Sequence, residues 1–269
     1  EREPLALILI LLMIVDAMCE GAWGESLSYA INTNGFLREQ DVFQAVVSDF
    51  FDLGSRVVQS LGDPLRGESV KTGVDQGVEY TEGWIVKMLR AYRRRRKKSD
   101  RMFSFSSKRY NRGFQQRLKK FGARPQRGVY VLRHSGAANY VARALREEKE
   151  EVNAVLEKGR RRGRWANLKS MQVYTKTHLL ARSIASLRPD VLRRGAYLLD
   201  NLDLLADVWV ERFFEAGEQE NSHSYWSRDM RLRPPPGYEI PDDYVVWSFG
   251  VADDDDADGG GSSPDTDSE

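Results

Sequence analysis

The eleven residues from Leu5 to Val15, LALILILLMIV, are all apolar, and Asp16 closes the run. The run is too short to span a bilayer, which takes about 20 apolar residues. The apolar core of a secretory signal would fit its length, with Arg2 before it. The chain begins with Glu1, however, and we expect it to be an internal segment of a longer protein. A helix that is apolar on every face must be buried, so residues 4–19 are predicted to form a central core helix.

The remaining pattern predicts a mainly α fold with a small antiparallel β-sheet (α+β). Short strands are expected at 56–61 and 77–80, separated by turn-rich sequence. A strand-like piece at 129–132 is expected to lead into a long helix reaching Lys158, with a basic loop over 159–164. Further helices are predicted over 25–32, 37–47, 82–98, 107–120, 168–174, 178–187 and 191–216. The last of these either packs on a neighbouring protomer or covers its own core.

The charges are strongly segregated along the chain, although the formal net charge is only +1. Residues 91–124 contain fourteen Lys or Arg and a single acid, Asp100, whereas residues 253–269 contain eight acids and no base. This separation is typical of a polyanion-binding body with an acidic tail. A solvated helix face or an import signal would also explain a basic run. The single Cys19 and three histidines leave no Cys/His cluster for structural zinc, and we expect no metal or cofactor.

Four short segments carry the residues that suggest chemistry: GFLREQDV with Arg38, VKTGVDQGV with Lys71, VYVLRHSGAA with Arg133, and GRWANLKSMQVYTK with Trp165 and Tyr174. Each residue has an ordinary explanation when it is taken alone. Arg38 could pair with Asp41 on a helix face, Lys71 could be a turn lysine, and the two aromatic residues could belong to the core.

Taken in this order, the four segments resemble the catalytic core of the tyrosine recombinase family, the phage-type integrases. That family has an arginine box of the form G-[LF]-R-x-x-[ED], a hairpin lysine often written K-T-G, then H-x-L-R-H, and G-[HW] nine residues before a nucleophilic tyrosine. Here one extra residue separates Gly35 from Arg38, and Trp165 precedes Tyr174 by nine residues. The resemblance covers residues 1–185.

The resemblance implies a role for each matched residue. Arg38 and Arg133 would clamp the non-bridging oxygens of a DNA phosphodiester, where charge develops in the transition state. Lys71 would protonate the 5′-oxygen that leaves, Tyr174 would be the nucleophile, and Trp165 would hold the phosphate through its indole N–H. No cofactor is required.

One position departs from the family pattern. The first His of H-x-L-R-H is replaced by Tyr130, whose phenol has an ordinary pKa near 10 and is a weak general base at neutral pH. His134 follows Arg133 as it does in the family, and it is expected to be a packing residue behind the site rather than the missing base.

Residues 1–187 would form the catalytic domain, 188–250 a C-terminal helical extension with a Pro-rich segment, and 251–269 a disordered acidic tail, and an N-terminal domain would be missing upstream. The protein would be a site-specific DNA recombinase or integrase in an intracellular, DNA-associated setting (nuclear in a eukaryotic host), working on double-stranded DNA as a synaptic tetramer without a membrane. The alternatives are a DNA-binding relative that does not cleave and a basic helical scaffold protein. The residues predicted to contact DNA are Arg93, Arg94, Arg95, Arg96, Lys97, Lys98, Lys108, Arg109, Arg112, Arg161, Arg162 and Arg164.

Overall fold

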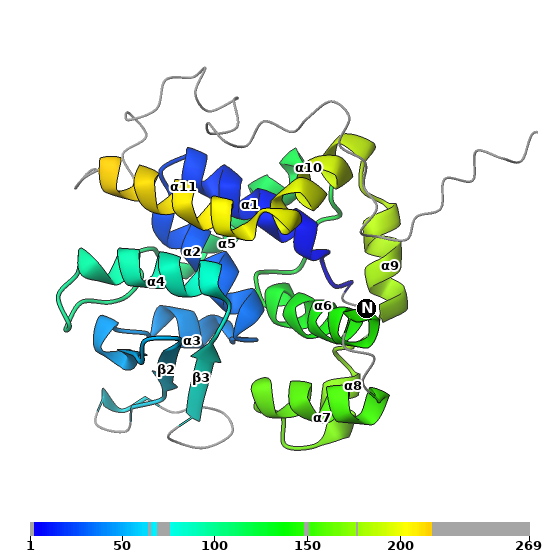
Figure 1. Ribbon diagram of the computed structural model, residues 1–269, viewed down its shortest axis with the longest axis horizontal. Helices are drawn as coiled ribbons and strands as arrows, with labels where there is room; N and C mark the ends of the chain where they lie inside the picture. Colours follow the sequence, from blue (N-terminus) through cyan, green and yellow to red (C-terminus); the bar gives the residue numbers. More distant parts are fainter. Residues whose placement is uncertain (1–2, 64–65, 69–75, 148–150, 176, 217–269) are drawn as a thin grey trace, which may run out of the picture.

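The computed structural model describes residues 3–63, 66–68, 76–147, 151–175 and 177–216. Its helices are α1 (Leu7–Cys19), α2 (Trp23–Asn34), α3 (Glu39–Phe43), α4 (Gly83–Arg94), α5 (Ser107–Lys120), α6 (Val131–Glu147), α7 (Val152–Arg162), α8 (Leu168–Gln172), α9 (Thr177–Ala185), α10 (Pro189–Asp200) and α11 (Leu202–Glu215). A 3-10 turn, η1 (Val47–Asp49), precedes the strands β1 (Phe50–Asp52), β2 (Val57–Leu61) and β3 (Gln76–Tyr80). The predicted class, mainly α with a small antiparallel sheet, is confirmed (Figure 1).

Helix α1 is the centre of the core, as the apolar run predicts. Every residue from Ile8 to Met18 is buried, and helices α2, α5, α6 and α10 pack around it. Gly195 lets α10 approach closely, because a Cβ there would lie 2.7 Å from the Ile8 Cβ and 2.9 Å from its carbonyl oxygen. Among the described residues, no helix is both long and apolar enough to cross a membrane.

The predicted continuous helix over 191–216 is wrong in one respect, because it is interrupted at Asn201. This residue leaves helical geometry (φ −125°, ψ 42°), and its side-chain amide donates to the Tyr197 carbonyl at 2.8 Å, which closes α10. On α11, Trp209 and Phe213 pack edge-on against Trp23, with ring centroids 5.4 and 5.7 Å apart. These contacts agree with the alternative in which the segment covers its own core.

A buried ionic network joins α5 to α1 and α2. The Arg117 side chain is 3% exposed and forms ion pairs with Asp16 at 3.3 Å, Glu20 at 2.5 Å and Glu25 at 3.0 Å. Part of the basic charge predicted on the helix over 107–120 is therefore neutralised inside the protein.

The three-stranded sheet supports the helix that follows Arg38. Strand β2 is central and pairs antiparallel with β1 and β3, with Gln59 opposite Val78. The fully buried Gln59 accepts a hydrogen bond from the Tyr80 hydroxyl at 2.6 Å and donates to the Asp41 carbonyl at 3.3 Å. The sheet thus fixes the position of α3.

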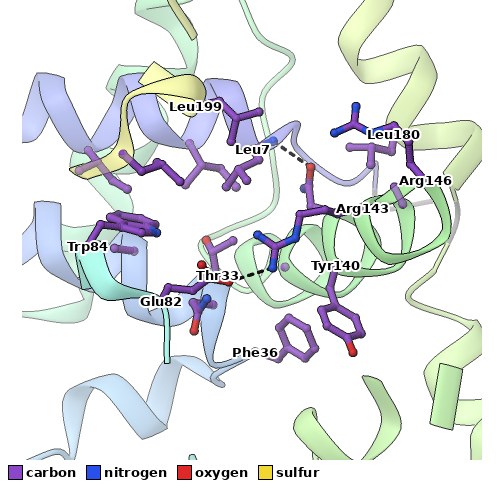
Figure 2. Close-up of a pocket in the computed structure, with 18 of the residues that line it drawn as sticks. Leu7, Thr33, Phe36, Glu82, Trp84, Tyr140, Arg143, Arg146, Leu180 and Leu199 are labelled. Atoms are coloured by element: carbon purple, nitrogen blue, oxygen red, sulfur yellow. Dashed lines mark hydrogen bonds and ion pairs between the residues drawn. The ribbon is translucent and has the colours of Figure 1, made fainter. Parts of the chain in front are cut away.

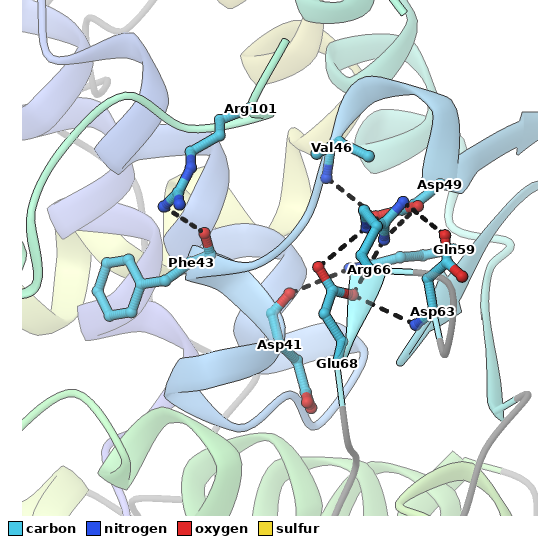
Figure 3. Close-up of polar contacts among 9 residues, drawn as sticks. All are labelled: Asp41, Phe43, Val46, Asp49, Gln59, Asp63, Arg66, Glu68 and Arg101. Atoms are coloured by element: carbon cyan, nitrogen blue, oxygen red, sulfur yellow. Dashed lines mark hydrogen bonds and ion pairs between the residues drawn. The ribbon is translucent and has the colours of Figure 1, made fainter. Parts of the chain in front are cut away.

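The segment after β2 is anchored to η1 by a second group of ion pairs (Figure 3). Arg66 donates to both Asp49 carboxylate oxygens, at 2.9 and 3.0 Å, and pairs with Glu68 and Asp63 at 3.0 and 3.1 Å. Asp49 also caps the backbone N–H of Val46 at 2.9 Å. The Arg66 guanidinium therefore links Asp63 and Glu68 to the 46–49 segment.

Two predicted elements around Arg133 are wrong. The strand-like piece at 129–132 does not form, because Val129, Val131 and Leu132 are buried in the helical core and the tertiary packing overrides their β-propensity. The predicted long helix ends at Glu147, and after an extended Glu151 the helix α7 runs through Arg162, where a basic loop was expected.

Candidate functional site

Four of the five residues predicted for catalysis come together although they are distant in sequence. Arg38 precedes α3, Arg133 lies in the first turn of α6, Trp165 follows α7, and Tyr174 follows α8. A small hydrophobic cluster separate from the main core includes Trp165 and is built from α6, α7, α8 and the loops beside them. Its members are Phe36, Ala137, Val141, Ala144, Val155, Leu156, Trp165 and Met171, with Tyr140, Leu145, Leu168 and Tyr174 at its edge.

Arg133 is the centre of the site and is 1% exposed. Its guanidinium donates to the carbonyl of Phe36 and, at 2.6 Å, to that of Gly163, and it lies 4.6 Å from the Trp165 ring. Arg133 can reach these carbonyls because α6 packs closely on the end of α2. A Cβ at Gly136 would lie only 2.0 Å from the Thr33 carbonyl oxygen. Arg133 therefore joins α6 to the two loops that carry Arg38 and Trp165.

Arg164 is a third guanidinium at the same place, with its side chain 7% exposed. It donates to the carbonyls of Gly35 and Phe36, each at 3.2 Å, and lies 3.6 Å from the Asp41 carboxylate. Phe36 and Arg164 both have positive φ, at 48° and 56°, a strained conformation for residues other than glycine. The strain is concentrated in the two loops that meet at Arg133.

The predicted side-chain pairing of Arg38 with Asp41 takes another form. The Asp41 carboxylate accepts from the Arg38 backbone N–H at 2.8 Å and caps α3, while its ion pair is with Arg164. The Arg38 side chain is half-buried, and its charge is close enough to lower the pKa of both Arg133 and Arg164. Of the three guanidinium groups, Arg164 pairs with this buried carboxylate and Arg133 lies close enough to feel its charge.

Burial, followed by the charges of Arg164 and Arg38, lowers the pKa of Arg133 to about 10. Because the folded protein holds this proton less tightly than the unfolded chain, the Arg133 charge lowers stability at every pH below about 10. That loss of stability is relieved only as the pH rises above about 10. The Nε atoms of Arg133 and Arg164 are also buried without a hydrogen-bond partner among the described residues. A site with excess positive charge and unsatisfied N–H donors is suited to bind an anion.

Tyr174 lies beside this cationic group and is half-buried. Its hydroxyl is 3.0 Å from that of Tyr130, and its ring centroid is 4.3 Å from His134 and 4.8 Å from Trp165. Trp165, which is 7% exposed, contacts both the Tyr174 ring and the Arg133 guanidinium. His134 packs on the tyrosine ring, and whether it serves only for packing stays a prediction.

Lys71 lies outside the described residues, so its place relative to the site stays a prediction. The two strands expected on either side of it, β2 and β3, are confirmed.

The basic run 93–98 lies away from the arginine cluster. Helix α4 ends at Arg94, and this end is at the left of Figure 1, whereas α7 and α8 are at the lower right. Arg95 lies over the Phe213 and Phe214 rings at 4.6 and 5.0 Å, and Arg96 over Tyr92 at 3.5 Å. Arg93 is half-buried, and burial lowers its pKa. The exposed cations of the run are Arg94, Arg95, Lys97 and Lys98.

The other residues predicted to contact DNA divide into two groups. Lys108, Arg109 and Arg112 are exposed on α5, where Arg109 pairs with Glu25 at 3.2 Å, and Arg161 is exposed on α7. Arg162 and Arg164 instead bind protein groups beside the site, with Arg162 donating to the Asn34 side chain at 2.7 Å. For these two residues, binding to the 34–36 loop is the role that the structure describes.

Sequence reasoning assigned Arg164 only to DNA contact, missed its place beside Arg133, and gave Tyr130 little weight. Arg164 adjoins Trp165 in the sequence, but a neighbouring position does not reveal that its side chain folds back onto the Gly35 and Phe36 carbonyls. Within the described residues, no group of three or more His, Cys, Asp or Glu side chains is placed to hold a metal ion.

An anion bound among the three arginines is expected to stabilise the protein. At ten times its dissociation constant, a ligand that binds only the folded state adds about 1.4 kcal/mol. Sulfate should therefore raise the melting temperature more than chloride at equal ionic strength, and Arg38→Gln and Arg164→Gln should lose much of the increment. Arg112→Gln, an exposed cation on α5, is the matched control and should keep it. Equal increments in all variants would mean that sulfate acts only through general exclusion from the surface.

Two solved structures of the XerH site-specific recombinase are similar to this chain. One is a pre-cleavage complex with a difH substrate, at 15% sequence identity over 68% of this chain, and the other a post-cleavage complex with a palindromic difH substrate, at 14% over 66%. The TM-score is 0.47 for each, and this chain spans about half the length of those proteins, with 52% covered. No family model and no curated protein matches the sequence.

Proposed function

We propose that this chain cuts and rejoins DNA through a 3′-phosphotyrosyl intermediate, as a tyrosine-type strand transferase. The observation that supports this most is the meeting of Arg38, Arg133, Trp165 and Tyr174, which span 137 sequence positions, around an excess of buried positive charge. The motif resemblance and the spatial convergence are separate observations, since residues matched by accident have no reason to meet.

The reaction assigns each bond change to a residue. The Tyr174 hydroxyl oxygen attacks the phosphorus, and the bond from phosphorus to the 5′-oxygen breaks. The Tyr174 proton leaves through the hydrogen bond to Tyr130, 3.0 Å away, and passes to solvent. Lys71 gives the leaving 5′-oxygen its proton. Attack by a 5′-hydroxyl on the phosphotyrosyl bond then reverses the step and rejoins the strands.

The arginines stabilise the negative charge that develops on the phosphoryl oxygens. In this mechanism the half-buried Arg38 contacts the phosphate directly. The more deeply buried Arg133 and Arg164 contribute positive charge. Both terminal nitrogens of Arg133 donate to carbonyls, so this side chain fixes the loops and adds to the positive potential, and its Nε has no hydrogen-bond partner within the described residues.

A DNA-binding protein that does not cleave is the second candidate. The near-complete burial of Arg133 and the tyrosine at position 130 favour it, because a phenol is a weak base and a covered guanidinium is poorly placed to contact a phosphate. Assembly of four copies on DNA and an intracellular, DNA-associated location stay predictions under either candidate.

Covalent capture separates the two candidates. The chain is incubated with a pool of randomised duplexes that carry a nick, from which the cleaved fragment diffuses away and strands the intermediate. The proposal expects adducts that resist detergent, with the modified peptide containing Tyr174 in mass spectrometry. Salt-dependent duplex binding without any adduct would overturn strand transfer and favour the second candidate.

A further inference from the structure

A cleft of about 450 Å³ opens beside α6 (Figure 2). Helices α1 and α2, the start of α4, α6, α9 and the α10–α11 junction contribute its walls. Most of the surface is aliphatic or aromatic, and its main apolar residues are Leu7, Ile10, Trp84, Leu180, Leu199 and Leu202. Its size is that of a site for a few large side chains.

Charged residues also line the cleft, and the basic ones are in excess. Arg143, Arg146 and Arg162 contribute three positive charges, and Glu82 and Asp200 two negative ones. Glu82 is already engaged, because it accepts from Arg143 at 2.8 Å. The Thr33 hydroxyl in the wall is buried and has no hydrogen-bond partner within the described part of the chain. The cleft therefore fits an occupant that is apolar and negatively charged.

The chain itself contains a segment with this chemistry. Residues 238–249, YEIPDDYVVWSF, combine seven aromatic or aliphatic side chains with three acids and no base. Helix α11 begins at the cleft with Leu202 and is about 21 Å long. The 21 residues 217–237 that follow can extend about 70 Å, which is more than enough to return along the helix.

We propose that residues 238–249 bind in this cleft within the same molecule, with their aromatic side chains on the apolar wall and their acids near Arg143, Arg146 and Arg162. Tyr140, Arg143 and Arg146 of α6 face the cleft, and the same helix carries Arg133 at its start. The bound segment would therefore brace the helix on which the arginine cluster depends. This inference does not rest on strand transfer, because the contacts exist in any chain with this cleft and this segment.

Disulfide trapping tests the proposal in the full chain. In a Cys19→Ser background, Arg146→Cys and Asp243→Cys place one thiol at the exposed side of the cleft and one in the segment. A docked segment has a millimolar effective concentration, so mild oxidation should crosslink this pair at least about tenfold faster than a distant pair. The product should have the mass of one chain. Arg112→Cys with Asp243→Cys is the matched control, since Arg112 is exposed on α5 and does not line the cleft.

Two crosslinking results would overturn the proposal. Equal crosslinking rates for both pairs would mean that the segment does not reside at the cleft, and a disulfide-linked dimer as the main product would mean that it binds a second copy. Hydrogen exchange of the uncrosslinked chain gives an independent measurement. The amides of 238–249 should exchange at least about tenfold more slowly than in a free peptide, and Arg146→Glu should remove much of this protection. Exchange at the free-peptide rate would equally refute docking.

Discussion

Replacing Tyr174 with Phe is expected to lower covalent adduct formation on nicked duplex by at least about 10³-fold, because the variant lacks the attacking oxygen. The ring keeps its contacts with His134 and Trp165. Duplex affinity should therefore stay close to that of the unmodified chain, and the defect should appear in the rate of adduct formation at saturating DNA. Unchanged adduct formation would show that Tyr174 is not the nucleophile.

Tyr130→Phe is the matched variant, since it removes the hydroxyl 3.0 Å away and preserves the ring that packs on His134. Loss of a proton relay is expected to slow adduct formation by about 10²-fold. The adduct that remains should still map to Tyr174, and the pH profile should change. If Tyr174→Phe cleaves normally while Tyr130→Phe does not, the roles of the two phenols are reversed.

The elements that sequence predicts well are those whose pattern leaves few alternatives. The run from Leu5 to Val15 must be buried as a helix, and every residue of α1 from Ile8 to Met18 is buried. Strands β2 and β3 are set by short apolar segments between turn residues. The start of α6 was mispredicted because Val129 to Leu132 suit a strand locally, and only the surrounding helices determine that they are buried in a helical setting.

The site shows the same contrast between residues that the sequence pattern identifies and features that only the tertiary structure determines. Motif spacing identified Arg38, Arg133, Trp165 and Tyr174, and these residues do meet. The role of Arg164 depends on a backbone with positive φ that turns its side chain toward the Gly35 and Phe36 carbonyls. The basic run 93–98 is obvious in sequence, yet its distance from the site follows from the direction of α4. Charge along a chain therefore predicts poorly how charge is distributed on its surface.

Two arginines of almost equal burial are expected to respond in opposite ways to the same substitution. Arg117→Met should lower the free energy of unfolding by about 3–5 kcal/mol, because it leaves buried carboxylates without their counter-charge. Burial lowers the Arg117 pKa, but Tyr29 and the acids Glu20, Glu25 and Asp16 outweigh it and hold that pKa above its usual value. Urea denaturation with circular dichroism measures the change. A loss below about 1 kcal/mol would mean that the carboxylates find solvent instead.

Arg133→Met should change the free energy of unfolding by no more than about 1 kcal/mol, because relief from like charges and from desolvation offsets the lost bonds to the Phe36 and Gly163 carbonyls. The same variant should lose both the extra rise in melting temperature in sulfate and the formation of the covalent DNA adduct, whereas folded Arg117→Met should keep both. Arg133 lies among other cations at a cost in stability, which is explained if it binds an anion. Arg117 lies among carboxylates, which is explained by its contribution to folding. If Arg133→Met instead unfolds the chain as severely as Arg117→Met, Arg133 is a structural residue and the phosphate clamp loses its central member.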